Sequence, residues 1–300
     1  MEKVLVLGGN GFIGKNLSHA LKKQGKQVTS FDLTIPMQQE TGIEYVCGDF
    51  FDEETLEKYT EGVDIIYHGI CTINPGNSVS EYMRGYTKDF IQTVKLCEIV
   101  KKKGIRMIFL SSGGTVYGKQ EEMPISEECA TAPINHYGNL KVCIENCIKI
   151  FNLQNGTNIL IARIANPYGP GQDYEKGIGF VDAVLKRGIA GKSIEIWGDG
   201  SIVRDYIYIE DVVQMLCQLA EYRGKEQIFN LSTGVGKSQT EVVLAAKKLI
   251  PHLEVTYKPV RNVDVSEVIL DNKKIKMIHT EHILTFEEGL EKYFYHLSKV

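Results

Sequence analysis

The fold is decided by the stretch KVLVLGGNGFIG, residues 3–14. Its first half is a short apolar run, typical of a strand that is buried on both faces of a parallel sheet. Gly8, Gly11 and Gly14 follow in G-x-x-G-x-x-G spacing, before a helix predicted to begin near Phe12. Glycine permits a tight turn, lets the backbone approach a pyrophosphate, and lets helix and strand pack closely. The pattern therefore predicts a strand–helix unit that binds a dinucleotide.

The ends of the next two predicted strands indicate which dinucleotide binds. QVTSFD ends in Asp32, about 20 residues after the glycines, where a carboxylate can accept hydrogen bonds from an adenosine ribose diol. That carboxylate would repel a 2′-phosphate, and no Arg or Lys follows in LTIP, so NAD is favoured over NADP. Asp49 and Phe50 suit the adenine amino group and ring face, or are plain loop residues. The helix start at Phe12 and Ile13 is expected to offer N–H donors to the pyrophosphate.

Length and patterning predict two lobes. The 300 residues are 43% hydrophobic, enough for a large core. Short Val/Ile/Leu-rich runs alternate with amphipathic segments, so residues 1–165 are predicted to form an α/β Rossmann lobe with a doubly wound parallel sheet. A later strand near residues 228–232 is expected to join that sheet. From residue 166 the sequence becomes loop-like, and 166–300 are expected to form mainly a smaller α/β substrate-binding lobe.

Charge and cysteine usage exclude several classes of partner. The formal net charge is −4 and the pI is near 6.0, which gives no support for nucleic acid or an anionic membrane surface. No apolar run approaches the roughly 20 residues of a membrane span, and no room is left for a signal peptide, so a cytoplasmic location is expected. The seven cysteines are scattered without metal-ligand spacing, so we expect reduced thiols and no metal.

The segment YGNLK places Tyr137 and Lys141 four residues apart, on one helix face. A tyrosine with a pKa near 10 is a poor base at neutral pH. Lowering that pKa by about three units takes roughly 4 kcal/mol of preferential phenolate stabilisation, which a neighbouring ammonium and a nicotinamide cation can supply. Tyr-x-x-x-Lys is common on surface helices, but its position after the fifth strand of a dinucleotide fold favours a catalytic base.

These motifs together resemble the nucleotide-sugar epimerase/dehydratase family of extended short-chain dehydrogenases/reductases, typified by UDP-glucose 4-epimerase. The resemblance spans nearly the whole chain, through GGNGFIG, SSGGTVYG, YGNLK, RIANPYGPGQ, WGDGSIVRDYIYIEDV and FNLSTG. It implies NAD in the first lobe, a nucleoside diphosphate sugar such as a UDP-sugar in the second, and a homodimer through the helices at 81–103 and 136–152. By position, Asn166, Arg204 and Arg261 should face the sugar pyrophosphate, although Arg204 has an ion pair with a nearby Asp as the alternative.

One departure from the family concerns the catalytic hydroxyl. In the family a Ser or Thr stands four residues before the tyrosine of VYG, and that position is Gly113 here. Ser112 and Thr115 flank it, and the resemblance implies that one of them replaces the missing hydroxyl, with Thr115 slightly favoured. The alternative is that no hydroxyl acts and turnover is slow. A second departure is Asp89, at a position where the family usually has asparagine.

The resemblance favours C4 epimerisation. Family dehydratases carry Asp and Glu before VYG, whereas this chain has glycine and Thr115. In an epimerase Tyr137 removes the 4-hydroxyl proton, a 4-keto sugar forms with NAD as hydride acceptor, and the hydride returns to the other face. Counting from Arg261, the position that limits pocket size in sugar 4-epimerases falls at Val268. A small residue there leaves room for an N-acetyl group, so the substrate is expected to be a UDP-hexose or a UDP-N-acetylhexosamine, or the substrate range is broad; simple core packing is the alternative role of Val268. A dehydratase, reductase or dehydrogenase of the same fold, and a weakly catalytic NAD- and nucleotide-sugar-binding protein, remain as alternatives.

Overall fold

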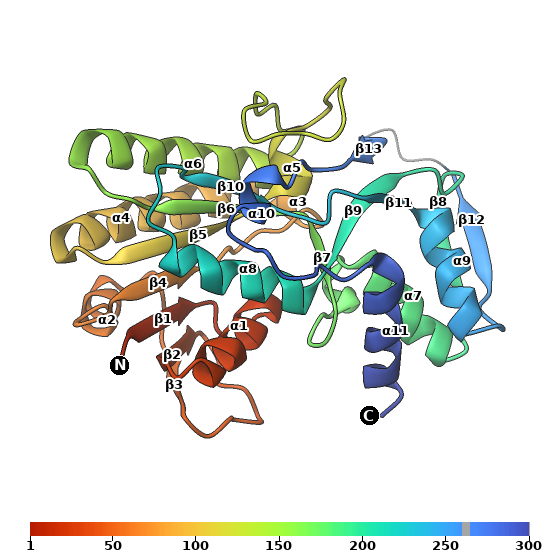
Figure 1. Cartoon of the computed structure of the whole chain (residues 1–300), viewed down its shortest axis with the longest axis horizontal. Helices are drawn as coiled ribbons and strands as arrows, with labels where there is room; N and C mark the ends of the chain where they lie inside the picture. The colour runs from red at the N-terminus through yellow and green to blue at the C-terminus, as the bar shows by residue number, and fades with distance from the viewer. Residues whose placement is uncertain (260–264, 300) are drawn as a thin grey trace.

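Seven parallel strands form the sheet of the first lobe in the computed structural model, which describes residues 1–259 and 265–299 (Figure 1). Their order across the sheet is β10-β6-β5-β4-β1-β2-β3. The bounds are β1 (Lys3–Leu7), β2 (Gln27–Asp32), β3 (Ile43–Cys47), β4 (Ile65–His68), β5 (Arg106–Ser112), β6 (Leu160–Ile164) and β10 (Ile228–Leu231). The order reverses between β1 and β4, and ligands of such sheets bind beyond the carboxyl ends of the strands at this point.

Helices cover both faces of this sheet. One face carries α1 (Phe12–Lys23) and α8 (Ile209–Glu221), which pack on each other. The other carries α2 (Glu53–Tyr59), α4 (Ile91–Lys103) and α6 (His136–Asn155). Side chains alternate along β1: Val4 and Val6 join the core under α1 and α8, whereas Leu5 and Leu7 join the core under α4 and α6. The predicted doubly wound α/β sheet is confirmed.

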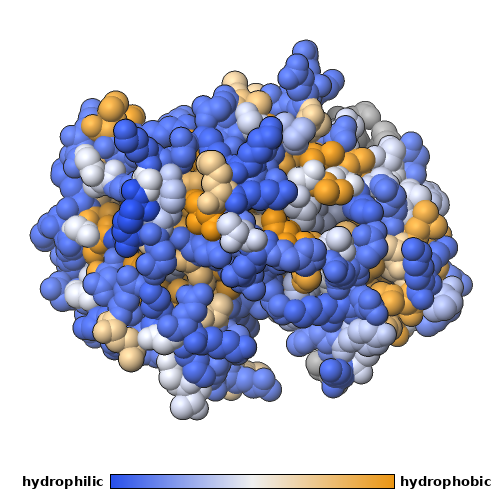
Figure 2. Space-filling model, viewed as in Figure 1, coloured by the Kyte–Doolittle hydropathy of each residue, from blue (hydrophilic) through white to orange (hydrophobic). Residues whose placement is uncertain are grey.

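The second lobe holds two smaller sheets. In one, β9 (Val203–Tyr208) pairs with β7 (Asn166–Tyr168), β11 (Gly236–Ser238) and β13 (Glu267–Val268), and in the other β8 (Ile194–Trp197) pairs with β12 (Val255–Lys258). Their core is shared with α7 (Phe180–Ile189), α9 (Gln239–Leu249) and α11 (Phe286–Leu297). Figure 2 shows a notch between the two lobes at the lower edge of the view.

The chain returns to the first lobe after entering the second. Helix α8 lies on α1, and β10 pairs with β6 at the edge of the large sheet. Short elements complete the described chain: α3 (Ser78–Arg84), the π-helix η1 (Gly85–Phe90), α5 (Gly113–Val116), the 3₁₀ turn η2 (Tyr174–Lys176) and α10 (Lys273–Lys276). Across the described parts of the chain, each helix is too short or too polar to cross a membrane.

Candidate active site

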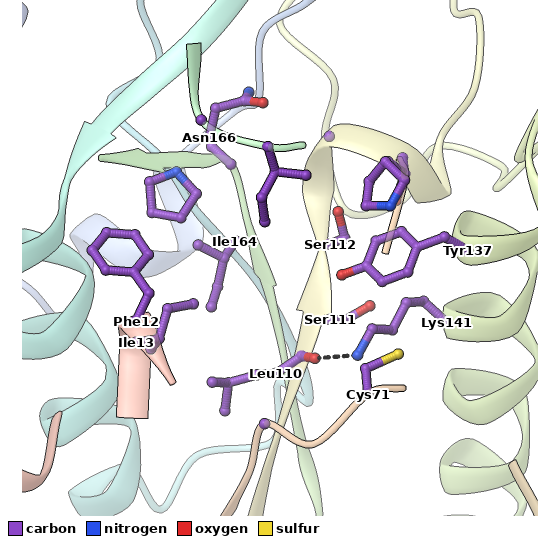
Figure 3. A pocket seen from close by; sticks show the side chains of 18 of the residues that line it. Phe12, Ile13, Cys71, Leu110, Ser111, Ser112, Tyr137, Lys141, Ile164 and Asn166 are labelled. Atoms are coloured by element: carbon purple, nitrogen blue, oxygen red, sulfur yellow. Dashed lines mark hydrogen bonds between the residues drawn. The ribbon is translucent and has the colours of Figure 1, made fainter. Parts of the chain in front are cut away.

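A cavity of about 540 Å³ lies between the lobes, at the carboxyl ends of the large sheet's strands (Figure 3). The first lobe lines it with the glycine loop, the turn after β4, the end of β5 and the start of α6. The second lobe contributes residues that follow β6 and residues of β9. The lining includes Gly8, Gly11, Phe12, Ile13, Gly14, Cys71, Leu110, Ser111, Ser112, Gly114, Thr115, Tyr137, Lys141, Asn166, Arg204 and Val265.

The glycine loop forms a cradle that larger residues would fill. Gly8 has a φ of +86°, and a Cβ on Gly14 would lie only 2.1 Å from the carbonyl oxygen of Gly8. Within the described residues no side chain caps the start of α1, so the N–H groups of its first turn are open to a ligand. Phe12 and Ile13 of that turn line the cavity. The loop can therefore hold a pyrophosphate against a helix N-terminus.

Asp32 lies beside this loop at the end of β2. Its Oδ2 accepts a hydrogen bond from the N–H of Asn10 at 3.0 Å, and its Oδ1 accepts one from Leu33 at 2.8 Å. These bonds hold the carboxylate at the strand end, where a ribose diol can reach it. The cradle and this carboxylate fit NAD.

The residues that follow β3, Asp49 and Phe50, are those expected to contact adenine, and only one of them is accessible. Asp49 is exposed, and its Oδ1 accepts the N–H of Phe51 at 2.9 Å. Phe50 is 2% exposed, and its ring packs 5.0 Å from that of His68, centroid to centroid. The expectation that Phe50 offers its ring face to adenine is therefore wrong, because the ring is already enclosed in the core.

Tyr137 and Lys141 extend from the first turns of α6 into the cavity (Figure 3). The helix is fixed by Asn135, whose Oδ1 accepts the N–H of Gly138 at 2.8 Å. Lys141 is 3% exposed; its Nζ donates to the carbonyl oxygen of Leu110 at 3.0 Å and lies 5.7 Å from the centroid of the Tyr137 ring. The ammonium is therefore held beside the phenol by the end of β5.

The surroundings of this pair act on both pKa values. Burial raises the pKa of Tyr137, while the charge of Lys141 and a hydrogen bond from Ser112 act in the opposite direction. Burial on its own would lower the pKa of Lys141, but the neighbouring Cys71, Tyr137, Asp89 and Glu145 raise it overall. Lys141 therefore stays an ammonium at neutral pH. Tyr137 would need further positive charge nearby to become an effective base.

Of the two candidate hydroxyls, Ser112 is the one that faces Tyr137 (Figure 3). Ser112 is the last residue of β5 and lines the cavity. Thr115 also lines the cavity, but its Oγ1 is buried and has no hydrogen-bond partner in the described chain. A Cβ on Gly113 would point into the core, 2.3 Å from Cδ1 of Leu270. The geometry thus favours Ser112, contrary to the slight preference for Thr115 from the sequence.

A buried ionic network lies behind these residues. Glu145 is fully buried and pairs with Arg163, 1% exposed, at 2.6 Å. The Oε1 of Glu145 also accepts a hydrogen bond from the Ser111 hydroxyl at 2.6 Å. Arg163 donates a hydrogen bond to the Tyr117 hydroxyl at 2.8 Å. Sequence reasoning missed this network, although Glu145 stands four residues after Lys141 on the same helix face. It fixes the strand end that carries Ser112.

The π-helix η1 brings an acidic group against the turn that follows β4. Asp89, from the π-helix η1, accepts the N–H of Thr72 at 2.7 Å and its hydroxyl at 3.0 Å. It also accepts the thiol of Cys71 at 3.4 Å, and Cys71 lines the cavity near Lys141. Burial raises the pKa of Asp89, which the hydrogen bonds from Thr72 and Cys71 oppose.

The residues expected to bind substrate fall in different places. Asn166 lines the cavity and donates to the carbonyl oxygen of Asp205 at 3.0 Å, and Arg204 lines the cavity from β9. Arg261 lies outside the described residues. Val268 is 2% exposed and packs in the first-lobe core; Val265 lines the cavity instead. The alternative role of Val268, core packing, is the one that the geometry favours.

Two features limit the chemistry of the site. The described residues contain no group of three His, Cys, Asp or Glu side chains that could hold a metal ion. Among the described residues that line the cavity there is no Asp or Glu. Acid–base work in the cavity therefore falls to Tyr137, with Lys141, Ser112 and Cys71 around it.

Residues 4–232 match the family model of the NAD dependent epimerase/dehydratase family. A UDP-glucose 4-epimerase of Mycolicibacterium smegmatis is 30% identical over 303 residues, covering 97% of this chain and 96% of that protein.

Solved structures agree with the sequence comparisons. The UDP-glucose 4-epimerase of Thermotoga maritima with UDP-glucose superposes with a TM-score of 0.93, at 30% identity and 99% coverage of both chains. The UDP-glucose 4-epimerase of Thermus thermophilus in complex with NAD superposes with a TM-score of 0.90, at 26% identity and 99% coverage of both chains.

Proposed function

The chain belongs to the NAD-dependent epimerase/dehydratase family, and we propose that it epimerises a nucleoside diphosphate sugar at C4. It is an NAD-dependent nucleotide-sugar epimerase, and a UDP-hexose or UDP-N-acetylhexosamine is the substrate that we propose. The observation that carries this function is the grouping of Tyr137, Lys141 and Ser112 in one cavity with no lining carboxylate among the described residues.

That grouping supports epimerisation over dehydration. Elimination of water from a sugar needs an acid and a base close to the bond that breaks, in addition to the group that handles the 4-hydroxyl proton. The cavity offers Tyr137 alone for proton transfer beside Ser112, and no Asp or Glu from its described lining. Epimerisation needs only one proton to be removed from a hydroxyl and later returned to the same oxygen.

Each step at the hydroxyl can be assigned to a side chain. Ser112 accepts a hydrogen bond from the sugar hydroxyl and donates one to the Tyr137 oxygen, so that it relays the sugar proton to Tyr137. Lys141 stabilises the phenolate through its charge, while the carbonyl oxygen of Leu110 holds the ammonium in place. NAD, when bound, would supply the hydride acceptor and donor for C4, and its nicotinamide cation would add positive charge near Tyr137.

The glycine cradle and Asp32 are the residues that we propose to hold NAD. Gly8, Gly11 and Gly14 leave room for the pyrophosphate, and the open helix start at Phe12 and Ile13 donates to it. The Asp32 carboxylate accepts hydrogen bonds from the adenosine ribose diol. Asp49, at the end of the neighbouring strand, is the proposed partner of the adenine amino group.

The second lobe is where we propose that the nucleotide sugar binds. Asn166 and Arg204 line the cavity on that side, and a guanidinium pairs well with phosphate oxygens. Arg261 is proposed as a second cation for the same diphosphate.

We also propose a homodimer. Helices α3, α4 and α6 pack together and expose apolar side chains, including Met83, Ile91 and Ile150. A cytoplasmic location is proposed as well, supported by the seven cysteines, which all lie in the described chain and are all free thiols.

The function is tested by incubating the purified protein with UDP-glucose, UDP-N-acetylglucosamine and UDP-glucuronate separately, with and without added NAD. Proton NMR follows the sugars, and absorbance at the NADH band follows the cofactor. The proposal expects a C4 epimer of at least one sugar without net NADH. A product that has lost water, or NADH formed in proportion to product, would contradict it.

A further inference from the structure

Asp89 is a buried carboxylate at the edge of the candidate active site. It belongs to the π-helix η1, is 2% exposed, and faces the turn that leads from β4 into the cavity. A π-helix is rare and is often found at functional sites. Burying a carboxylate is costly unless hydrogen bonds or a cation compensate, so the partners of Asp89 indicate what it does.

The two oxygens of Asp89 have different surroundings. Oδ2 accepts three hydrogen bonds, from the N–H of Thr72, the hydroxyl of Thr72 and the thiol of Cys71. Oδ1 is buried and has no hydrogen-bond partner within the described chain. Oδ2 alone thus fixes the turn, which an uncharged amide oxygen could do equally well. The negative charge of Asp89 is not needed for these bonds.

Cys71 links Asp89 to the surroundings of Lys141, because its thiol donates to Asp89 at 3.4 Å and its side chain lies beside Lys141 in the cavity (Figure 3). At this separation of one side chain, the charge of Asp89 acts on Lys141. The ionisable groups around Lys141 come from three elements and a turn: His68 on β4, Cys71 in the turn after it, Asp89 on η1, and Tyr137 and Glu145 on α6. Arg163, on β6, lies behind Glu145.

Most of these groups bring no net negative charge at neutral pH. Burial lowers the pKa of His68 to about 3, so it is neutral there. Burial raises the pKa of the Cys71 thiol, which therefore stays protonated. Glu145 is balanced by its ion pair with Arg163. Asp89 is the remaining carboxylate among these groups, and when it is ionised Lys141 is the cation among them that faces its charge.

We propose that Asp89 is a positioning residue that acts through Lys141 and sets the pH at which Tyr137 becomes a base. While Asp89 is ionised, its charge offsets part of the field of the Lys141 ammonium, so less of that field stabilises the Tyr137 phenolate. The inference rests on the proposed role of Tyr137 as the base of the reaction. An amide at position 89 would keep the hydrogen bonds of the turn but remove the negative charge. More of the field of the Lys141 ammonium would then stabilise the Tyr137 phenolate.

The test compares Asp89→Asn with the unchanged protein, both saturated with NAD. Tyrosine labelled with ¹³C at Cζ reports phenol ionisation by NMR, and the chain has 15 tyrosines, so Tyr137→Phe identifies the Tyr137 resonance. The titration midpoint of Tyr137 should fall by roughly 0.5–1 pH unit in Asp89→Asn. The rising limb of kcat/KM against pH should move by the same amount.

Two controls separate charge from structure. Thr72→Val removes one hydrogen bond to Asp89 without changing any charge, and should leave the Tyr137 midpoint where it is. Asp211→Asn removes another buried carboxylate, on α8, that is not among the groups acting on Lys141, and should also leave it unchanged. If Asp89→Asn does not fold, Asp89→Ser removes the same charge and takes its place.

The outcomes are distinct from those that test the function. An unchanged Tyr137 midpoint in Asp89→Asn overturns the inference, since Asp89 would then act only on the turn. A midpoint that also moves in Thr72→Val overturns it too, because the turn and not the charge would be responsible. A protein whose Tyr137 midpoint shifts as expected but that epimerises no nucleotide sugar would contradict the proposed function and leave the electrostatic role of Asp89 standing.

Discussion

Gly113 packs so closely against Leu270 that a Cβ at position 113 would lie 2.3 Å from Cδ1 of the leucine. The same Cβ would lie 3.1 Å from the carbonyl oxygen of Arg163. A side chain at this position therefore points into the core, while the preceding residue, Ser112, faces Tyr137. The glycine pair therefore leaves a hydroxyl in the cavity beside Tyr137, that of Ser112.

Removing the Ser112 hydroxyl should slow the reaction. We expect Ser112→Ala to lower kcat by about 10²-fold, since the hydroxyl both orients the sugar and relays its proton. Thr115→Val keeps the shape of a side chain whose Oγ1 has no hydrogen-bond partner in the described chain, so kcat should change by less than about threefold. Steady-state kinetics of both variants decide which hydroxyl acts. A larger loss of kcat in Thr115→Val than in Ser112→Ala would identify Thr115 as the catalytic hydroxyl.

Placing a serine at position 113 should not improve the enzyme. Gly113→Ser has to displace Leu270, and we expect it to lower the free energy of unfolding by about 1–3 kcal/mol without raising kcat. Gly114→Ala is the matched control for stability, because its Cβ would meet Asn166 at an ordinary 3.5 Å. Urea unfolding measures both. A faster and equally stable Gly113→Ser would show that position 113 faces the substrate after all.

Breaking the buried ion pair behind the site should destabilise the protein. Glu145→Ala leaves Arg163 charged and unpaired in the core, and we expect a loss of about 3–5 kcal/mol in the free energy of unfolding. Glu98→Ala, which removes an exposed partner of Lys101 at 3.5 Å, should change it by less than about 1 kcal/mol. Denaturant unfolding at pH 7 compares the two, and equal losses would mean that the buried pair contributes no more than the exposed one.

The pH dependence of stability should report on Asp211. Burial raises its pKa to about 6 from 3.8, with further raising by Glu210. The folded protein thus holds the Asp211 proton more tightly than the unfolded chain, and its stability falls as pH rises from about 4 to 6. Asp211→Asn lacks this titration and can still accept the N–H of Leu284. Its stability relative to the unchanged protein should rise across that window, by up to about 3 kcal/mol. If the free energies of unfolding of the two proteins differ by the same amount at every pH from 4 to 8, the raised pKa of Asp211 is contradicted.

Charges placed on the exposed apolar helices should separate the proposed dimer. Met83→Glu and Ile150→Glu lie on α3 and α6, and a buried charge at either site opposes association. Analytical ultracentrifugation should show a dimer for the unchanged protein and a monomer for the double variant. Leu244→Glu, at an exposed position on α9 of the other lobe, is the control and should remain dimeric. A monomeric unchanged protein would contradict the dimer.

The parts of the site predicted from the sequence depend on local spacing. The glycine cradle, Asp32 and the pair of Tyr137 and Lys141 each lie within one turn or one helix, where residue spacing fixes geometry. The structure places each of them at the carboxyl ends of the strands or in the cavity.

The parts that could not be predicted depend on contacts between distant segments. Phe50 and Val268 are buried by packing that their own neighbours in sequence do not indicate. The choice between Ser112 and Thr115 depends on where β5 ends and α5 begins, which is at residue 113. Arg163 lies on strand β6 and Glu145 on helix α6, so the residue spacing gives little sign of the pair.

The fate of the hydrogen at C4 tests the central claim most directly. The protein is given the UDP-sugar that it converts, labelled with deuterium at C4, and the product is analysed by NMR and mass spectrometry. An epimerase in which Tyr137 handles only the hydroxyl proton returns the same hydrogen to C4, so the product should keep the full label at that carbon. Deuterium moved to C6 would indicate a dehydratase, and label lost into released cofactor would indicate a dehydrogenase; either result would contradict the account.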